Sequence, residues 1–238
     1  MSIQSFQGNT FVAFLDVCGF TELMGSAGQA ERALDCFFRS VFEEVQRSHE
    51  RFQRIDCIAV SDCAIAFARR NETMQNQDTH LDNHLRNEDS EKLESMLFFA
   101  KNVSRKLIQN RILLKGSIWY GEFKFENRIE IPGIDKAMFV GNAYLNAYRD
   151  VEQGHPKIEV GEIRLRPRGK IDEIIGENTA NGEIDLLQLK KDDYYFYWML
   201  NSVQPLNAFE NAMKDSYRRR FEGIISVIKE YVELPARL

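Results

Sequence analysis

Two aspartates are the residues of this chain that point most clearly to chemistry, because each lies in a run of apolar residues. The first run, FVAFLD, ends at Asp16, and the second, CIAVSDCAIAF, contains Asp62. Apolar β-forming residues before Asp16 predict a buried strand whose carboxylate lies at the rim of a sheet, where a cation and phosphates can reach it. Two such carboxylates from neighbouring strands are the ligands that a pair of hard divalent cations requires.

Composition and charge limit the class of protein. The chain has 238 residues and is 44% hydrophobic, which is enough for one domain of ordinary size with elaborations or for two small ones. The formal net charge is −5, so no basic field indicates nucleic-acid binding, and we expect none. The sequence has no apolar run of 18 residues and no signal-like N-terminus, so we expect no membrane insertion.

The four cysteines indicate the redox environment. Their spacing contains no zinc-like CxxC pair. Cys36 and Cys57 lie in apolar patterns that are typical of buried thiols rather than disulfides. We therefore expect a reducing, cytoplasmic location. The four are Cys18, Cys36, Cys57 and Cys63.

The first half of the chain predicts a strand, a helix, a hairpin and a second helix. Apolar residues recur at helical spacing between 30 and 47 and again between 93 and 107. Gly19 breaks the first strand, and Ser61 makes a tight turn between two later strands. The expected elements are a strand over 10–16, a helix starting at Thr21, a helix over 30–47, strands over 54–60 and 62–68, a polar mobile insertion or loop over 71–91, and a helix over 91–110.

The second half predicts further strands around one helix and a long final helix. Gly121 is expected to separate two strands, Gly141 to start a helix, and Pro205 to lie in the first turn of the last helix. The expected elements are strands over 112–120 and 122–126, a helix over 140–151, a strand over 158–165, a polar turn-like segment over 172–183, a strand over 194–200 and a helix over 205–232. This mixture indicates an α+β sheet covered on one face.

Four motifs follow one another in an order that resembles the class III nucleotidyl cyclase domain. They are DVCGFT at 16–21, the hairpin with Ser61 and Asp62, GSIWYG at 116–121, and FVGNAYLNAYR at 139–149. The most specific parts are the DxxGFT turn and the pattern G-x-A-x-x-x-A-x-R that runs from Gly141 to Arg149. The resemblance covers roughly residues 10–200.

The resemblance implies a ferredoxin-like α+β fold with a mainly antiparallel sheet, helices on one face and a C-terminal helix. It also implies how the chain is divided. Residues 1–200 form the catalytic domain, with the polar insertion at 71–91, and residues 201–238 form a C-terminal helical extension of the same domain.

The resemblance also implies roles for individual residues. In such cyclases the ribose 3′-hydroxyl attacks the α-phosphate and pyrophosphate leaves, with two divalent ions, Mn²⁺ or Mg²⁺, at each site. Asp16 and Asp62 match the two metal aspartates, and the carbonyl of Val17 matches a further ligand. Arg149 matches the transition-state arginine, whose planar fork suits a crowded phosphorane. The turn expected to cradle the triphosphate contains Cys18, Gly19, Phe20 and Thr21.

Two further roles have more than one candidate. The asparagine that orients the ribose in the family falls at Leu145 here, so Asn142 or Asn146 is the candidate, or the ribose is held otherwise. Lys190 or Lys191 lies near the place of the family's lysine for the terminal phosphates, although the pair also fits a solvated face.

Two departures from the purine cyclases bear on the base. Those enzymes carry a lysine four residues before the second metal aspartate, where this chain has Ile58. They carry a polar residue, often aspartate, three before the glycine of the later motif, where this chain has Met138. Neither side chain can read a purine by hydrogen bonds. We expect other groups on the strand of Ile58 to read the base, with Arg54 and Asp56 as candidates unless these two pair with each other.

Retained metal residues combined with a lost purine reader resemble the bacterial pyrimidine cyclases of the Pycsar anti-phage systems. That resemblance implies conversion of UTP to 3′,5′-cyclic UMP and diphosphate, with CTP and cyclic CMP as the alternative. It also implies functional pairing with a separate effector that senses the cyclic nucleotide.

One copy of each motif predicts a homodimer with two composite sites arranged head to tail. Each subunit then gives its aspartates to one site and Arg149 to the other. Other functions stay open, namely a purine cyclase with an unusual pocket and a catalytically silent nucleotide-binding module. A diguanylate cyclase is disfavoured, because the hairpin turn Val60-Ser61-Asp62 lacks a Gly-Gly-acidic sequence.

Overall fold

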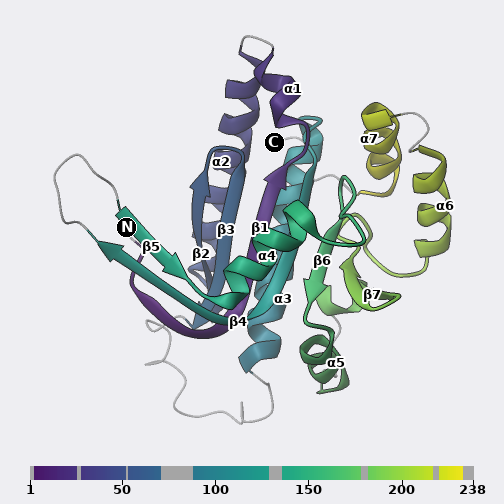
Figure 1. The fold of residues 1–238 in the computed structure, drawn as a ribbon. Helices are drawn as coiled ribbons and strands as arrows, with labels where there is room; N and C mark the ends of the chain where they lie inside the picture. The colour runs from purple at the N-terminus through teal and green to yellow at the C-terminus, as the bar shows by residue number, and fades with distance from the viewer. Residues whose placement is uncertain are drawn as a thin grey trace.

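The computed structural model describes residues 3–25, 28–51, 53–70, 88–128, 136–177, 182–216 and 220–232. These residues build an α+β fold on a sheet of eight strands (Figure 1). The strands lie in the order β2-β3-β1-β4-β6-β8-β7, and β5 pairs with β4 off this path. Every described pairing is antiparallel except that of β4 with β6, so the predicted mainly antiparallel α+β fold is confirmed.

The strands are β1 Phe6–Val17, β2 Gln53–Val60, β3 Cys63–Arg70, β4 Leu114–Arg128, β5 Lys136–Val140, β6 Ile163–Arg166, β7 Leu187–Lys190 and β8 Asp193–Phe196. The helices are α1 Phe20–Met24, α2 Gln29–Ser48, α3 Glu88–Gln109, α4 Asn142–Gln153, α5 Arg168–Glu177, α6 Leu206–Ser216 and α7 Arg220–Tyr231, with a short 3-10 helix η2 at Glu183–Leu186. No helix in the described part of the chain combines the length and apolar character needed to cross a bilayer.

Strand β1 is the centre of the fold because both of its edges are paired and both of its faces are buried. Phe11 and Leu15 belong to the larger core cluster, which includes α2 and α3, while Val12 and Phe14 belong to a second cluster with α4. The alternation of side chains along a strand explains the two sets. Figure 1 shows α4 crossing the sheet on the face opposite α3. Helices therefore cover both faces, not one, at this part of the sheet.

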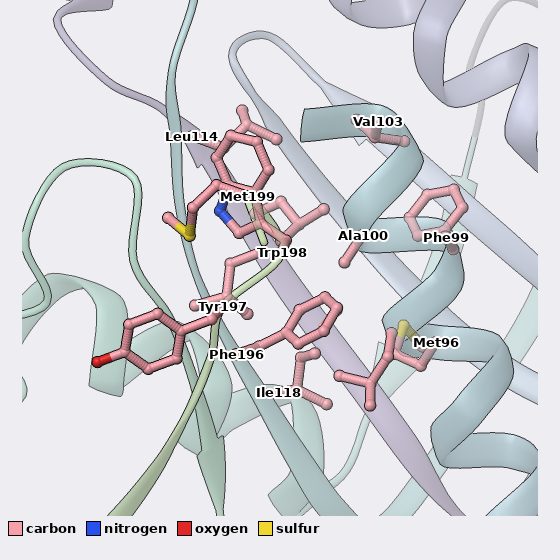
Figure 2. Close-up of a cluster of buried hydrophobic side chains, with 14 of the residues drawn as sticks. Met96, Phe99, Ala100, Val103, Leu114, Ile118, Phe196, Tyr197, Trp198 and Met199 are labelled. Carbon is pink, nitrogen blue, oxygen red and sulfur yellow. The ribbon is translucent and has the colours of Figure 1, made fainter. Parts of the chain in front are cut away.

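The larger core is filled by α3, β4 and the segment that follows β8. Figure 2 shows Ala100 of α3 facing Ile118, Phe196 and Trp198, and Met96, Phe99 and Val103 of the same helix belong to this cluster. Trp198 is buried, and its indole N–H donates a hydrogen bond of 2.8 Å to the Gly161 carbonyl. Helices α6 and α7 add Phe209, Met213, Ile224, Ile225 and Ile228 to the same cluster.

Several expected boundaries differ from the structure. Strand β4 continues through Gly121, because it pairs with β1 from Phe6–Phe125 to Val17–Leu114. The glycine serves a close approach instead, since a Cβ there would collide with the amide oxygen of Asn142 at the start of α4. The predicted turn at 172–183 is wrong over α5, where Ile171 and Ile174 bury one side of a helix.

Other differences concern the second half of the chain and the insertion. Residues 158–162 precede β6 instead of forming it, residues 136–140 form β5, and the aromatic strand β8 ends at Phe196 after a short β7. The final helix is two helices, α6 and α7. Most of the predicted insertion, residues 71–87, lies outside the described residues, and 88–91 begin α3.

A buried ionic network joins α4 to the sheet. Arg164 of β6 is fully buried and donates hydrogen bonds of 2.9 and 2.6 Å to the two carboxylate oxygens of Asp150 on α4. The Ser117 hydroxyl of β4 donates to the same carboxylate at 2.7 Å, and Arg166 adds a bond of 3.0 Å. Asp193 of β8 completes the network, because its carboxylate forms an ion pair with Arg166. Each buried charge is thus paired, which is the condition for keeping charges in a core.

The network predicts the effect of removing one guanidinium. Arg164→Met leaves the carboxylate of Asp150 buried with fewer partners, and we expect the free energy of unfolding in urea to fall by about 3–5 kcal/mol. Arg168→Met is the matched control, because that side chain is 45% exposed, and we expect it to stay within about 0.5 kcal/mol of wild type. If the two substitutions lowered the free energy of unfolding equally, the buried network would contribute no more to stability than an exposed arginine.

Candidate metal and nucleotide site

The ends of three strands position Asp16, Asp62 and Cys63. Asp16 is the next-to-last residue of β1 and lies directly opposite Cys63, the first residue of β3. Asp62 lies in the tight turn before β3, where Ser61 has a φ of 53°. The turn is fastened to β1, because the Val17 N–H donates a hydrogen bond of 2.9 Å to the Asp62 carbonyl.

This arrangement brings three metal-ligating side chains together. One carboxylate oxygen each of Asp16 and Asp62 and the sulfur of Cys63 all lie within 4.8 Å of one another. The Cys63 sulfur is 3.4 Å from Asp16 Oδ1 and 3.9 Å from Asp62 Oδ1. Two carboxylates this close repel each other unless a cation lies between or beside them. Oxygen donors in such a group fit Mg²⁺ or Mn²⁺.

Lys115 supplies a positive charge to this group and was not among the predicted site residues. It lies on β4 directly opposite Asp16, and its Nζ is 3.1 Å from Asp16 Oδ2. The only sequence signal was a lone lysine within an apolar strand, and the register of β1 with β4 gives that lysine its partner. Cys63 was missed for the same reason, because its opposition to Asp16 depends on the register of β1 with β3.

Burial sets the protonation of these groups. It raises the pKa of Asp16, an effect opposed by Lys115 and strengthened by the charge of Asp62. Burial also raises the pKa of the Cys63 thiol, and the charges of Asp16 and Asp62 raise it further. Cys63 is therefore a neutral thiol, a weak ligand next to two strong oxygen donors.

The turn after β1 has fewer free N–H groups than the sequence indicated. The N–H groups of Val17 and Cys18 are already bonded, to the carbonyls of Asp62 at 2.9 Å and Leu113 at 2.8 Å. Gly19 then adopts a φ of 76°, which favours glycine, and precedes α1. The part of the turn that can offer N–H groups to a phosphate begins at Gly19 and continues through Phe20 and Thr21.

The remaining predicted phosphate and ribose residues lie on other elements. Arg149 is exposed and Asn146 half-exposed on α4. Within the described residues, no hydrogen bond or ion pair joins Arg149 to Asp16 or Asp62. Lys190 is paired with Glu210 at 3.0 Å, and Lys191 lies exposed in the turn between β7 and β8 with a φ of 57°.

The candidate base-reading residues separate into two groups. Arg54 is bonded to both oxygens of Asp56 at 2.8 and 3.1 Å, and Asp56 is 2% exposed and also pairs with Arg69. The interpretation in which Arg54 and Asp56 pair with each other is therefore confirmed. Ile58 on β2 and Met138 on β5 are half-buried apolar residues.

Comparisons with known proteins give the fold but no close relative. No family model matches the chain, and no curated protein matches it. Among solved structures, a dimeric guanylyl cyclase domain from the fungus Blastocladiella emersonii is 11% identical with a TM-score of 0.50 over 82% of this chain and 98% of that one. A bacterial light-regulated adenylyl cyclase is 10% identical with a TM-score of 0.52, over 95% of this chain and 59% of that one.

The fold of this chain is that of a class III nucleotide cyclase domain. At these identities the likeness concerns the fold alone. The roles of the individual site residues therefore depend on the geometry described above and on the experiments that follow from it.

Because the pKa of Asp16 is raised, we expect Asp16→Asn to change the melting temperature in opposite directions with and without metal. A carboxyl whose pKa is raised by folding stabilises the protein below its unfolded pKa, and that contribution is lost as pH rises through the folded pKa. Asp16→Asn keeps the neutral state at all pH values. In EDTA at pH 7 we expect the variant to melt at a higher temperature than wild type, with the gap closing as pH falls toward about 4.

Adding Mn²⁺ should reverse the order of the melting temperatures of wild type and Asp16→Asn. Wild type gains melting temperature through ligand binding to the folded state, whereas Asp16→Asn gains little because it has lost a ligand. Asp35→Asn, an exposed acid on α2, is the control and should behave like wild type in both conditions. An equal Mn²⁺ effect on all three proteins would contradict the metal assignment.

Proposed function

We propose that this chain is a metal-dependent pyrimidine nucleotide cyclase that converts UTP into 3′,5′-cyclic UMP and diphosphate. The observation that carries the proposal is the grouping of Asp16 and Asp62 within 4.8 Å, on the fold of a cyclase domain. Their carboxylates and the Val17 carbonyl would hold the divalent ions, Mn²⁺ or Mg²⁺. Bound ions would neutralise the triphosphate and lower the pKa of the ribose 3′-hydroxyl.

The residues of the chain have separate tasks in this reaction. A bond forms from O3′ to the α-phosphorus, the bond from that phosphorus to diphosphate breaks, and the hydroxyl proton passes from O3′ to solvent water. The Gly19–Thr21 turn offers N–H groups to the phosphates, and Arg149 stabilises the charge on the α-phosphate as it becomes five-coordinate. Asn146 orients the ribose, and Lys190 or Lys191 binds the terminal phosphates once Lys190 leaves Glu210. Lys115, paired with Asp16 at 3.1 Å without metal, is free to turn to the triphosphate when Asp16 binds an ion.

The pyrimidine preference rests on Ile58 and Met138, which stand where purine cyclases place polar base-reading residues. Neither offers a hydrogen bond to a purine edge, and the pairing of Arg54 with Asp56 leaves these two with partners inside the protein. Apolar residues at both places suit a smaller base but do not separate uracil from cytosine. CTP, giving cyclic CMP, is therefore the second candidate substrate.

The combination of a metal site with a lost purine reader supports a place in anti-phage defence. In the Pycsar systems a cyclase of this kind makes a cyclic pyrimidine nucleotide, and a separate effector responds to it. We propose the same pairing here, with a cytoplasmic cyclase as the source of the messenger. A silent nucleotide-binding module is the alternative that an activity assay excludes.

A homodimer with shared sites completes the proposal. Arg149 is exposed on α4 without a bond to the aspartates of its own chain, as a residue that serves a partner's site would be. Val60, Val140, Leu145 and Tyr148 are large apolar side chains left 40–58% exposed on α4 and at the ends of β2 and β5. Because α6 and α7 share the main core, residues 201–238 are best treated as an extension of the catalytic domain at 1–200.

The substrate is tested by offering each of the four NTPs with Mn²⁺ and identifying the products by mass spectrometry. We expect cyclic UMP, or cyclic CMP if CTP is the substrate, and a loss of about 100-fold or more in Asp62→Ala. Cyclic AMP, cyclic GMP or a dinucleotide would contradict the proposal, and no product from any NTP would favour the silent module. The double variant Ile58→Lys, Met138→Asp should lose pyrimidine activity more than it loses Mn²⁺ binding.

The shared site is tested by mixing two inactive chains. Asp62→Ala and Arg149→Ala are each expected to be inactive, and an equal mixture should recover about a quarter of wild-type activity, because half of the dimers then hold one intact site. Mixing Asp62→Ala with Asp16→Ala is the control, since both lack the same half of the site. If the first mixture recovers no more than the control, the composite site is wrong.

A further inference from the structure

A cavity lies between helix α6 and strands β6, β7 and β8 at the edge of the sheet. Its volume is about 230 Å³, and its apolar lining includes Ile163, Phe196, Met199, Phe209 and Met213. Figure 1 shows α6 standing beside β7 at this edge, and Figure 2 shows the Tyr197 ring pointing away from α3. A space of this size admits a small molecule with a single ring or a short chain.

The surface beside the cavity already holds a cation. The Lys190 Nζ lies 4.8 Å above the ring centre of Tyr197 and 5.4 Å above that of Tyr195, and both rings line the cavity. Its counterion is Glu210 of α6 at 3.0 Å, which also accepts a hydrogen bond from the Tyr197 hydroxyl. Aromatic faces and a carboxylate together favour positive charge.

A second carboxylate in the cavity lacks such a partner. Glu162 lines the cavity, and within the described residues no basic side chain lies within 4 Å of its carboxylate. Its hydrogen bond comes from the backbone N–H of Glu159, at 2.9 Å. Burial raises the pKa of Glu162, and the charges of Lys190 and Arg164 offset this rise only in part.

We infer that this cavity binds a small organic cation with an apolar body, such as an arylalkyl amine. The apolar part occupies the space beside Ile163, Phe209 and Met213, and the ammonium group pairs with Glu162 near the ring of Tyr195. The charge balance favours a cation over an anion, because three carboxylates, of Glu159, Glu162 and Glu210, line the cavity against two ammonium groups, of Lys190 and Lys214. This binding does not depend on the proposed cyclase activity.

The wall of the cavity is bonded to the metal site through the backbone. The Gly116 N–H donates a hydrogen bond of 2.9 Å to the Glu162 carbonyl, and the Gly161 N–H donates one of 2.9 Å to the Leu114 carbonyl. These two bonds flank Lys115, the residue that pairs with Asp16. We therefore expect a ligand that moves Glu162 to shift Lys115 as well, and so to change the affinity for metal.

Binding is tested on metal-free protein with phenethylammonium as the probe and with phenylpropionate as an anion of similar body. The two tryptophans of the chain give two indole N–H signals in NMR. The Trp198 N–H bonds the Gly161 carbonyl in the cavity wall, whereas Trp119 packs in the cluster on the other face. We expect phenethylammonium to shift the Trp198 signal with a Kd below about 10 mM and to leave the Trp119 signal unchanged. Phenylpropionate should shift neither signal.

Glu162→Gln keeps the shape of the side chain and removes its charge, so we expect it to weaken binding about tenfold. Glu222→Gln, on α7 with a side chain 65% exposed, is the matched control and should bind like wild type. The proposal is overturned if phenylpropionate binds as well as the amine, if Glu162→Gln binds unchanged while folded by circular dichroism, or if saturating amine leaves Trp198 unmoved.

The coupling has its own measurement. Free Mn²⁺ is followed by electron paramagnetic resonance with and without phenethylammonium, and linkage requires each ligand to change the affinity of the other by the same factor. We expect a change of about threefold or more in the Mn²⁺ affinity of wild type and none in Glu162→Gln. No change in wild type, while the Trp198 signal still reports binding, would overturn the coupling. Absence of Mn²⁺ binding altogether would count against the metal site and not against the cavity.

Discussion

The close approach of two carboxylates is the constraint on which the rest of this structure depends. Asp16 lies on β1 and Asp62 in the turn before β3, yet the pairing of β1 with β3 and the bond from the Val17 N–H to the Asp62 carbonyl hold one carboxylate oxygen of each within 4.8 Å of the other. Such a pair costs free energy in a half-buried place unless positive charge is near. Lys115 provides one charge from β4, and a divalent ion would provide more.

The surrounding fold keeps these residues in place from two sides. The larger core packs α2 and α3 under β1, and the second cluster packs α4 over it, so the end of β1 has little freedom. The ion network of Asp150 with Arg164 then fixes α4 to β4 and β6 one residue away from Arg149. A rigid sheet carries the two aspartates, and a rigid helix carries Arg149, as the proposed site shared between subunits would require.

The sequence allowed the local features to be predicted and left the pairings open. Asp16, Gly19 and Asp62 were recognisable because apolar runs and turn residues mark strand ends, and the register then brought the two aspartates together as expected. Lys115 and Cys63 were not found, because which residue lies opposite Asp16 depends on strand order and register. Helix α5 was missed because only Ile171 and Ile174 mark its buried side in a polar segment. Arg54 and Asp56 had two interpretations, and packing beside Arg69 realises the ion pair.

The central claim is that Asp16 and Asp62 bind the cations that hold a pyrimidine nucleoside triphosphate. The most direct measurement is a crystal structure with Mn²⁺ and a non-hydrolysable UTP analogue, with the ions located by anomalous scattering. We expect anomalous peaks about 2.0–2.4 Å from carboxylate oxygens of both aspartates, with Lys115 turned away from Asp16. Bound nucleotide with no ion on either carboxylate, and with the pair of Asp16 and Lys115 intact, would contradict it.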